Sequence, residues 1–370
     1  MLSENSILQN GKYRIIGILG QGGFGITYLG EDTLLGRKVA IKELYVKEIC
    51  EREKNNSVIT ADVNKPVFDR LYRRFLKEAK NLASINHPNI IRVFDCFEEN
   101  STAYYTMEYI DGINIHQYVK NKGVLSEREA ISLIQQAGNA LTYIHSLRMT
   151  HLDVKPSNLM LTKQMNRVVL IDFGLSIQYS NTENTTTMPS MVSNGFSALE
   201  MYNTSIHSEF SPATDVYSLA ATLLFMLTGK TPPSALDLAM GTQLNFPSSI
   251  LPATKETILK SLTTNKANRL NSISDFLATL SSPSLQGSTT KTVNSNIGVS
   301  DKEETVLLQN NYSGVSNKTL YPGSSKKGIG SFKLILLILI IIAIIVGCLF
   351  ATGKIIFWNE VAPINLTPYP

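Results

Sequence analysis

This 370-residue chain has few cysteines, a small net charge and a first segment that does not resemble a leader. Its three cysteines, Cys50, Cys96 and Cys348, lie far apart and form no CxxC pair, so they predict neither a disulfide framework nor a zinc site. The net charge of +4 is small for this length and gives no support for nucleic-acid binding. The first residues, MLSENSILQN, contain no basic start followed by an apolar run, so we expect no signal peptide.

The first third of the chain has the composition of β-strands. Residues 13–43 predict strands broken by glycines, in particular over residues 14–19 and 39–41. Residues 47–65 are polar, show no clear periodicity and are interpreted as a loop or insertion. The apolar spacing over residues 68–85 predicts a helix, and residues 90–97 and 103–109 return to strand-like composition.

From Ser126 onward the pattern becomes helical. Ser126 followed by Glu129 predicts a capping box at a helix start. One apolar stripe follows, made of Ile131, Ile134, Ala137, Leu141 and Ile144. A strand-rich first part before a helix-rich second part predicts an α+β fold with two lobes and a cleft between them.

Beyond residue 280 the composition changes again. Residues 281–331 are rich in Ser, Thr, Asn and Gly and cannot bury enough apolar surface to fold alone, so we interpret them as a flexible linker. Residues 334–351, LILLILIIIAIIVGCLFA, carry no charge and are long enough to span a bilayer. The alternative, a buried core helix, is disfavoured because the segment is rich in isoleucine on every face.

The flanks of this apolar segment predict its orientation. Three lysines precede it, Lys326, Lys327 and Lys333. The charged residues after it are only Lys354 and Glu360. This lysine excess places the N-terminal side in the cytoplasm. We therefore expect a single transmembrane helix over residues 332–353 and a short extracytoplasmic tail over residues 354–370.

A glycine-rich motif lies near the start of the strand-rich part. It consists of Gly20, Gln21, Gly22, Gly23, Phe24 and Gly25, a GxGxxG pattern. Glycine lets the backbone approach phosphate oxygens because no Cβ intervenes. A dinucleotide-binding loop would open a helix, whereas residues 26–29, ITYL, have the composition of a strand. The motif therefore predicts a strand–loop–strand flap over phosphate groups.

Three further segments follow this motif in order. They are VAIK, ending at Lys42; HLDVKPSN, over residues 151–158; and IDFG, over residues 171–174. Together with the glycine motif they resemble the protein kinase family, and the matches run over residues 13–280. Residues 1–12 form a short segment before this domain. The compact domain and the SALE segment at residues 197–200 look most like bacterial versions of the family.

The resemblance implies how ATP would be held. The glycine motif would cover the phosphates, and Lys42, oriented by Glu78 on the following helix, would bind the α- and β-phosphates. Met107 would be the gatekeeper, and the backbone at Glu108 and Ile110 would read adenine. The residues that would border the base are Ala40, Met160 and Thr27, of which Thr27 stands where the family usually has valine.

The resemblance also assigns the residues of the chemical step. Asp153 would orient the substrate hydroxyl and accept its proton, and Lys155 would stabilise the phosphate in transfer. Asn158 and Asp172 would hold Mg²⁺ (or Mn²⁺) against the nucleotide. Ser193 occupies a position typical of kinases that phosphorylate Ser and Thr rather than Tyr.

More distant matches concern the support of the catalytic loop. Glu200 would pair with Arg269, although Leu199 replaces the proline of the usual segment. Asp215 matches an aspartate that braces the catalytic loop. A spine would join the two lobes through Leu82, Val93, His151 and Phe173.

One departure concerns regulation. Leu152 stands where many members of the family carry an arginine that binds a phosphate on the activation loop. We therefore hypothesise an activity that is not gated by that contact, although Thr185, Thr186 and Thr187 remain candidate sites of autophosphorylation.

The interpretation is thus a serine/threonine protein kinase, anchored in the cell (inner) membrane by one helix, with ATP and protein substrates as partners. Its kinase domain would lie in the cytoplasm, and its substrates at the inner face of the membrane. A nucleotide-binding pseudokinase and a small-molecule kinase are the alternatives. The sequence leaves the substrate, the activating signal and the oligomeric state open.

Overall fold

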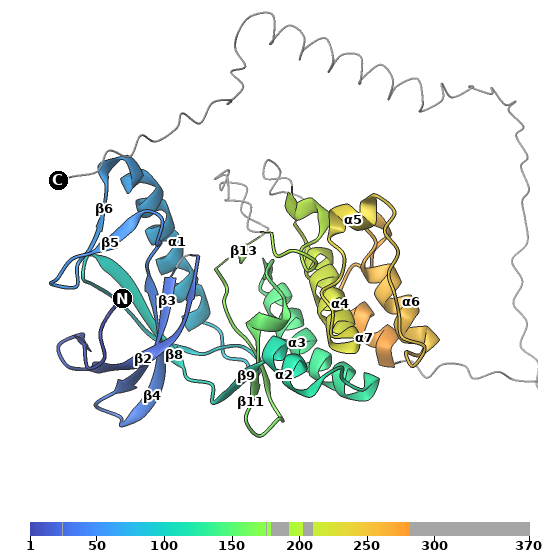
Figure 1. The fold of residues 1–370 in the computed structure, drawn as a ribbon, viewed down its shortest axis with the longest axis horizontal. Coiled ribbons are helices and arrows are strands. Elements are labelled where there is room, and N and C mark those ends of the chain that lie inside the picture. The colour runs from blue at the N-terminus through green and yellow to red at the C-terminus, as the bar shows by residue number, and fades with distance from the viewer. Residues whose placement is uncertain (24, 175, 179–191, 203–209, 282–370) are drawn as a thin grey trace, which may run out of the picture. The chain divides into compact units, whose positions relative to one another are not determined.

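A computed structural model describes residues 1–281, except residues 24, 175, 179–191 and 203–209 (Figure 1). The chain divides into two units, Met1–Thr290 and Lys291–Pro370, and all of the described residues belong to the first. Within that unit a strand-rich N-lobe precedes a helix-rich C-lobe, so the predicted order of strands and helices is confirmed.

An antiparallel six-stranded sheet forms the N-lobe. In spatial order its strands are β1 (Ile7–Leu8), β2 (Tyr13–Gly22), β3 (Gly25–Asp32), β4 (Arg37–Leu44), β8 (Thr102–Glu108) and β7 (Val93–Glu99). The strands predicted over residues 14–19, 26–29 and 39–41 lie within β2, β3 and β4 and are confirmed. Because β2 and β3 pair from Tyr13 and Asp32 up to Gly22 and Gly25, the glycine motif forms the turn of a hairpin, as predicted.

Helix α1 (Lys65–Ala83) packs against β7 and β8. It begins three residues before the predicted start, because Pro66 is tolerated in the first turn, where the missing N–H would have no partner. Its buried side chains are Phe68, Phe75, Ala79 and Leu82, which recur at the spacing of one helical face.

The segment over residues 47–65 is more ordered than predicted. It contains a small antiparallel hairpin, β5 (Cys50–Arg52) and β6 (Val58–Thr60), followed by the 3₁₀ turn η1 (Asp62–Asn64). The loop prediction was wrong because strands of three residues are too short to show a period of two. Tertiary contacts stabilise the hairpin instead: the Arg52 guanidinium binds the Glu43 carboxylate at 2.5 Å, and the Val58 N–H donates to the Asn100 carbonyl at 2.8 Å.

The C-lobe consists mainly of helices. They are α2 (Ile115–Lys122), α3 (Glu127–Ser146), α4 (Pro212–Thr228), α5 (Ala235–Ala239), α6 (Pro252–Ser261) and α7 (Ile273–Ser281). Helix α4 is buried along almost its whole length and contacts α3, α6 and α7, so it is the centre of this lobe. It ends at Gly229, which adopts a left-handed conformation (φ 67°) that favours glycine.

Two small sheets carry the loops that hold the motifs. β9 (Gly112–Asn114), β11 (Leu159–Thr162) and β12 (Val168–Leu170) form one sheet, and β10 (Met149–Thr150) pairs with β13 (Ile177–Gln178) in the other. The HLDVKPSN motif thus lies between β10 and β11, with Pro156–Asn158 in the 3₁₀ turn η2. The DFG motif lies between β12 and β13.

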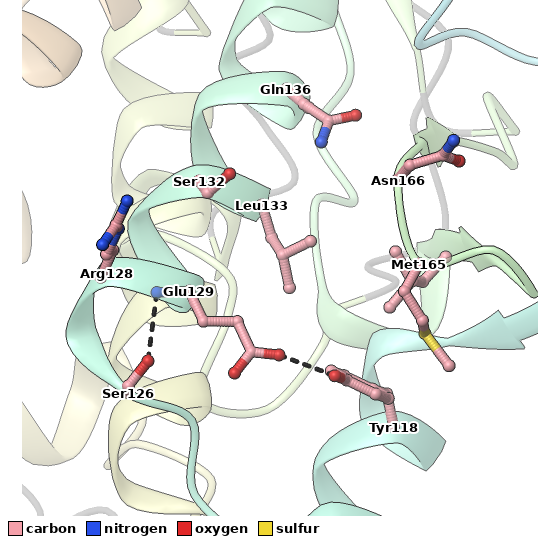
Figure 2. A pocket seen from close by; sticks show the side chains of 10 residues that line it. Tyr118, Ser126, Arg128, Glu129, Ser132, Leu133, Gln136, Met165 and Asn166 are labelled. Atoms are coloured by element: carbon pink, nitrogen blue, oxygen red, sulfur yellow. Dashed lines mark hydrogen bonds between the residues drawn. The ribbon is translucent and has the colours of Figure 1, made fainter.

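The predicted capping box at the start of α3 is only half formed. The Ser126 hydroxyl accepts the Glu129 N–H, as expected, at 3.3 Å. The Glu129 carboxylate turns away to accept the Tyr118 hydroxyl at 2.6 Å (Figure 2). It also accepts from the Lys122 ammonium at 2.7 Å. Glu129 therefore joins α3 to α2 at the edge of a hollow of about 370 Å³, instead of closing the helix start.

None of the helices in the described part of the chain is both long and apolar enough to cross a membrane. The predicted span over residues 332–353 and the tail over residues 354–370 lie outside the described residues. So does the linker predicted over residues 281–331, except for Ser281, which is the last residue of α7.

The Glu43–Arg52 pair generates a prediction for stability. Glu43 is fully buried and also accepts the hydroxyls of Tyr28 and Tyr104, while the Arg52 side chain is only 8% exposed. Arg52→Met leaves a buried carboxylate without its cation, so we expect the free energy of unfolding to fall by about 3 kcal/mol. Urea unfolding of the full chain, followed by circular dichroism, measures this change.

Arg14→Met is the matched control, because Arg14 pairs with Glu31 on the same sheet at a side-chain exposure of 48%. An exposed pair contributes at most about 1 kcal/mol. Equal losses in the two variants would show that the hairpin does not brace β4 through Arg52.

Candidate active site

Lys42 lies between two carboxylates from distant parts of the chain. Its ammonium Nζ is 3.2 Å from Glu78 Oε1 on α1 and 2.9 Å from Asp172 Oδ1 in the C-lobe. The Lys42 side chain is 14% exposed and that of Glu78 only 7%. The structure therefore brings together three residues that the sequence had assigned to phosphate and metal binding.

The electrostatics of this cluster keep Lys42 and Asp172 charged. Burial alone would lower the pKa of the Lys42 ammonium, but the carboxylates of Asp172 and Glu78 outweigh it and raise that pKa well above its ordinary value. The charge of Lys42 lowers the pKa of Asp172 to about 2. Asp172 is therefore ionised at neutral pH, as a cation ligand must be.

Tyr105, on β8, supports this cluster, although no sequence pattern singled it out. Its hydroxyl donates to Glu78 Oε1 at 2.9 Å. Burial raises the pKa of Tyr105 well above its ordinary value, so the phenol remains a proton donor. Glu78 is thus oriented from two sides, by Tyr105 and by Lys42.

The catalytic-loop residues converge on Asp153. Asn158 Nδ2 donates to its carbonyl and to its Oδ2, at 2.8 and 2.9 Å, and Lys155 Nζ is 2.9 Å from the same Oδ2. The Ser193 hydroxyl donates to Asp153 Oδ1 at 2.7 Å and accepts from Lys155 at 2.9 Å. An aliphatic hydroxyl can therefore reach both the carboxylate and the ammonium at once.

Two oxygen donors of the site suit a hard cation such as Mg²⁺. The Nδ2 atom of Asn158 is engaged with Asp153, which leaves its Oδ1 as the atom for a cation. Asp172 contributes an ionised carboxylate, and the Ile171 N–H donates to the Asn158 carbonyl at 2.9 Å, so the two residues lie on adjoining backbone segments. These residues fit the predicted metal.

Asp215 holds the backbone of the catalytic loop. Its carboxylate accepts the N–H groups of His151 and Leu152, and it pairs with His145 Nε2, each at 2.8 Å. Burial would raise the pKa of Asp215, but the hydrogen bond and charge of His145, with those of His151, lower it. The sequence had assigned a bracing role to Asp215 but not to His145.

Leu152 has a left-handed backbone conformation (φ 66°), which is unfavourable for a residue with a Cβ. The hydrogen bonds from the N–H groups of His151 and Leu152 to the Asp215 carboxylate stabilise it. Its side chain is buried against Met201 and Phe210. An apolar contact thus occupies the place that the resemblance assigns to a guanidinium.

The predicted pair of Glu200 and Arg269 is present and buried. Two hydrogen bonds, of 2.8 and 3.2 Å, join the carboxylate to the guanidinium. Arg269 also donates to the Ala213 carbonyl, and Thr214 donates to Glu200. The pair therefore anchors the 3₁₀ turn η3 (Leu199–Tyr202) to the start of α4.

The predicted spine residues are all buried. The rings of His151 and Phe173 meet edge to face with centroids 4.6 Å apart, and Leu82 and Val93 belong to the same apolar core as Phe173. This core crosses from α1 and β7 into the C-lobe.

The residues expected around adenine lie on four strands, β3, β4, β8 and β11. Ala40 and Met107 face each other in the register of β4 and β8, Thr27 faces Lys42 in that of β3 and β4, and Met160 lies on β11. Ile110 is buried just after β8.

Glu108 offers only its backbone to this region. Arg167, which the sequence did not single out, holds the Glu108 carboxylate with two hydrogen bonds of 2.7 and 3.0 Å.

The glycine motif combines open space with one close approach. A Cβ added at Gly20 or Gly22 would meet no atom within 4 Å, whereas one at Gly25 would collide with the Glu43 carbonyl. Gly25 is therefore required for β3 to lie against β4. Gln21 and Gly23 are exposed. Phe24 lies outside the described residues, and so do Thr185, Thr186 and Thr187.

The family model for the protein kinase domain matches residues 13–286. Among curated proteins, the chain is 30% identical over 234 residues to serine/threonine-protein kinase PrkC of Bacillus subtilis (62% of this chain and 33% of that protein). It is 30% identical over 326 residues to serine/threonine-protein kinase B of Synechocystis (84% and 54%). It is 32% identical over 285 residues to serine/threonine-protein kinase PknB of Mycolicibacterium smegmatis (73% and 42%).

The chain thus spans between a third and about half of the length of these curated relatives. Among solved structures, the apo form of PpkA-294 matches with a TM-score of 0.64 at 24% identity, over 76% of this chain and 99% of the other. That likeness confirms the two-lobed fold predicted from the sequence.

Proposed function

The chain belongs to the protein kinase family, and we propose that it is an active serine/threonine kinase that transfers the γ-phosphate of ATP to protein hydroxyls. One observation supports this most strongly: Lys42, Glu78 and Asp172 meet in one cluster. Phosphoryl transfer needs positioned charge more than covalent chemistry, and this cluster supplies it. A pseudokinase would be expected to lack at least one of these groups.

The residues divide the work between binding and proton transfer. Lys42, fixed by Glu78, neutralises the α- and β-phosphates, and the open backbone of the glycine motif lies over them. Asp153 orients the acceptor hydroxyl and takes its proton, while Lys155 offsets charge on the phosphate in transfer. Asn158 and Asp172 would hold Mg²⁺ (or Mn²⁺), which would supply further positive charge at the phosphates.

The contacts of Ser193 support Ser or Thr as acceptor. Its aliphatic hydroxyl already lies within hydrogen-bond distance of Asp153 and Lys155. A Ser or Thr side chain of a substrate has the same reach, whereas a Tyr hydroxyl lies several bonds further from its backbone. We extend the same geometry to autophosphorylation, with Thr185, Thr186 and Thr187 as acceptors.

The packing of Leu152 supports an activity that does not wait for a loop phosphate. Leu152 is buried with Met201 and Phe210, and Asp215 fixes its backbone. The catalytic loop is therefore held without a guanidinium that would need a phosphate to neutralise it.

We further propose that the kinase is anchored in the cell membrane by residues 332–353, with its kinase domain cytoplasmic. The uncharged apolar run over residues 334–351 and the lysines before it support this. An anchor on a flexible linker raises the effective concentration of the kinase at membrane-bound substrates.

Incubation of the full chain with Mg-ATP tests the activity. Wild type should transfer labelled phosphate to itself or to a general Ser/Thr substrate, and Asp153→Asn should lower kcat by about 10²–10⁴-fold because it removes the base. Phosphatase-treated protein should start at the same rate as untreated protein.

Absence of transfer by wild type, with ATP still bound, would favour the pseudokinase. Transfer to a sugar or other metabolite but to no protein would favour a small-molecule kinase. A lag after phosphatase treatment would refute the role given to Leu152.

Deletion of residues 326–370 tests the anchor. The truncated kinase should leave the membrane fraction and phosphorylate membrane-bound substrates more slowly in cells, while its activity on a soluble peptide is unchanged. Deletion of residues 354–370 alone is the control and should keep the protein in the membrane. An unchanged distribution after the longer deletion would contradict the proposal.

A further inference from the structure

Arg74 lies on α1 one helical turn before Glu78, so the two side chains leave the helix on the same face. Its guanidinium donates through Nη2 to the backbone carbonyl of Gly174. The helix that carries Glu78 therefore contacts the Asp172–Gly174 turn in two ways. Glu78 reaches the Asp172 carboxylate through Lys42, and Arg74 binds the backbone carbonyl of Gly174 directly. Nothing in the sequence had distinguished Arg74 from its neighbours Arg70 and Arg73.

The turn that Arg74 contacts is one that needs support. Asp172 adopts a left-handed conformation (φ 61°), which the Cβ of an ordinary residue disfavours. The Gly174 N–H donates to Asp172 Oδ1 at 3.4 Å, and the Ser176 N–H donates to the Phe173 carbonyl at 2.9 Å. These two bonds close the turn upon itself but do not attach it to the N-lobe.

The environment of Arg74 indicates a positional role. Its side chain is partly buried, and no carboxylate of the described residues lies within ion-pairing distance of it. Burial lowers the pKa of Arg74, against the opposing effect of Glu78 and Asp172. A buried cation that binds a backbone carbonyl instead of a carboxylate gains less free energy than it would in an ion pair. Its main effect is to fix the position of the backbone that it binds.

Gly174 itself leaves little freedom at this contact. A Cβ there would lie 3.3 Å from Asp172 Oδ1 and 3.7 Å from Glu78 Oε2. The turn, the metal-binding carboxylate and α1 are therefore packed against one another. A displacement of α1 would therefore move the turn through the Arg74–Gly174 contact. It would also move Asp172, through the contacts of Lys42 with Glu78 and Asp172.

We propose that Arg74 is a positioning residue for the metal site: it holds the Asp172–Gly174 turn against α1, so that the Asp172 carboxylate is presented to Mg²⁺. This inference rests on the proposed kinase function. It makes the position of α1 a determinant of metal binding as well as of the Lys42–Glu78 pair.

The test compares Arg74→Met with Arg73→Met in the full chain. Arg73 is exposed on the same helix, so its replacement removes the same charge without touching the turn. Arg74→Met should raise the Mg²⁺ concentration for half-maximal phosphotransfer about tenfold and lower kcat about tenfold, because a loosened ligand costs binding and alignment. The KM for ATP at saturating Mg²⁺ should stay within about twofold of wild type. Arg74→Lys, which retains one donor, should restore part of the loss.

Hydrogen exchange separates this inference from the proposed function, since it needs neither ATP nor activity. Amides of Phe173 and Gly174, in the Asp172–Gly174 turn, should exchange faster in Arg74→Met than in Arg73→Met, with α4 unchanged. Faster exchange in α4 as well would reveal a general loss of stability and overturn the proposal. Identical Mg²⁺ dependence and identical exchange in the two variants would also overturn it. Faster exchange of the turn in a chain whose wild type transfers no phosphate would refute the kinase function and leave the positioning contact intact.

Discussion

The rest of the site depends on the ammonium of Lys42, which two carboxylates share. Glu78 is 36 residues away along the chain and Asp172 is 130 residues away, so this one side chain joins β4, α1 and the C-lobe. Without it, the carboxylates of Glu78 and Asp172 would lie near each other without the ammonium that now lies between them, which would destabilise the site. The contacts around it fix each partner in turn: Tyr105 orients Glu78, and the buried carboxylate of Glu43, next in sequence to Lys42, secures β4 from its other face.

Much of this arrangement could be predicted from the sequence, because phosphate and metal chemistry restricts residue types at fixed spacings. The glycine motif, Lys42, the catalytic loop and Asp172 each carry a group that the reaction requires, and their order along the chain was enough to identify the fold. The strands that carry them were also predictable, since short apolar runs are bounded there by glycine and polar residues. The pairing of Glu200 with Arg269 followed from the resemblance alone, and the structure contains it.

The features that escaped prediction are those that only the folded chain creates. Arg52 lies in a segment without periodicity, and its importance arises because folding places it over a buried carboxylate. Three further residues matter only through partners that are distant in sequence. Tyr105 binds Glu78, 27 residues away; Arg74 binds Gly174, 100 residues away; and Arg167 binds Glu108, 59 residues away. The capping prediction at Ser126 was half wrong for the same reason, because tertiary partners on α2 compete for the Glu129 carboxylate.

The contact between Lys42 and Glu78 implies that the two residues act as one unit in phosphoryl transfer. A double-mutant cycle with Lys42→Met, Glu78→Gln and the combined variant measures this most directly, with kcat/KM for a Ser/Thr peptide as the readout. We expect strong coupling: the combined variant should lie within about threefold of Lys42→Met alone, because Glu78 has nothing left to orient. Losses that simply multiply would show that the two residues act independently and would refute their shared role.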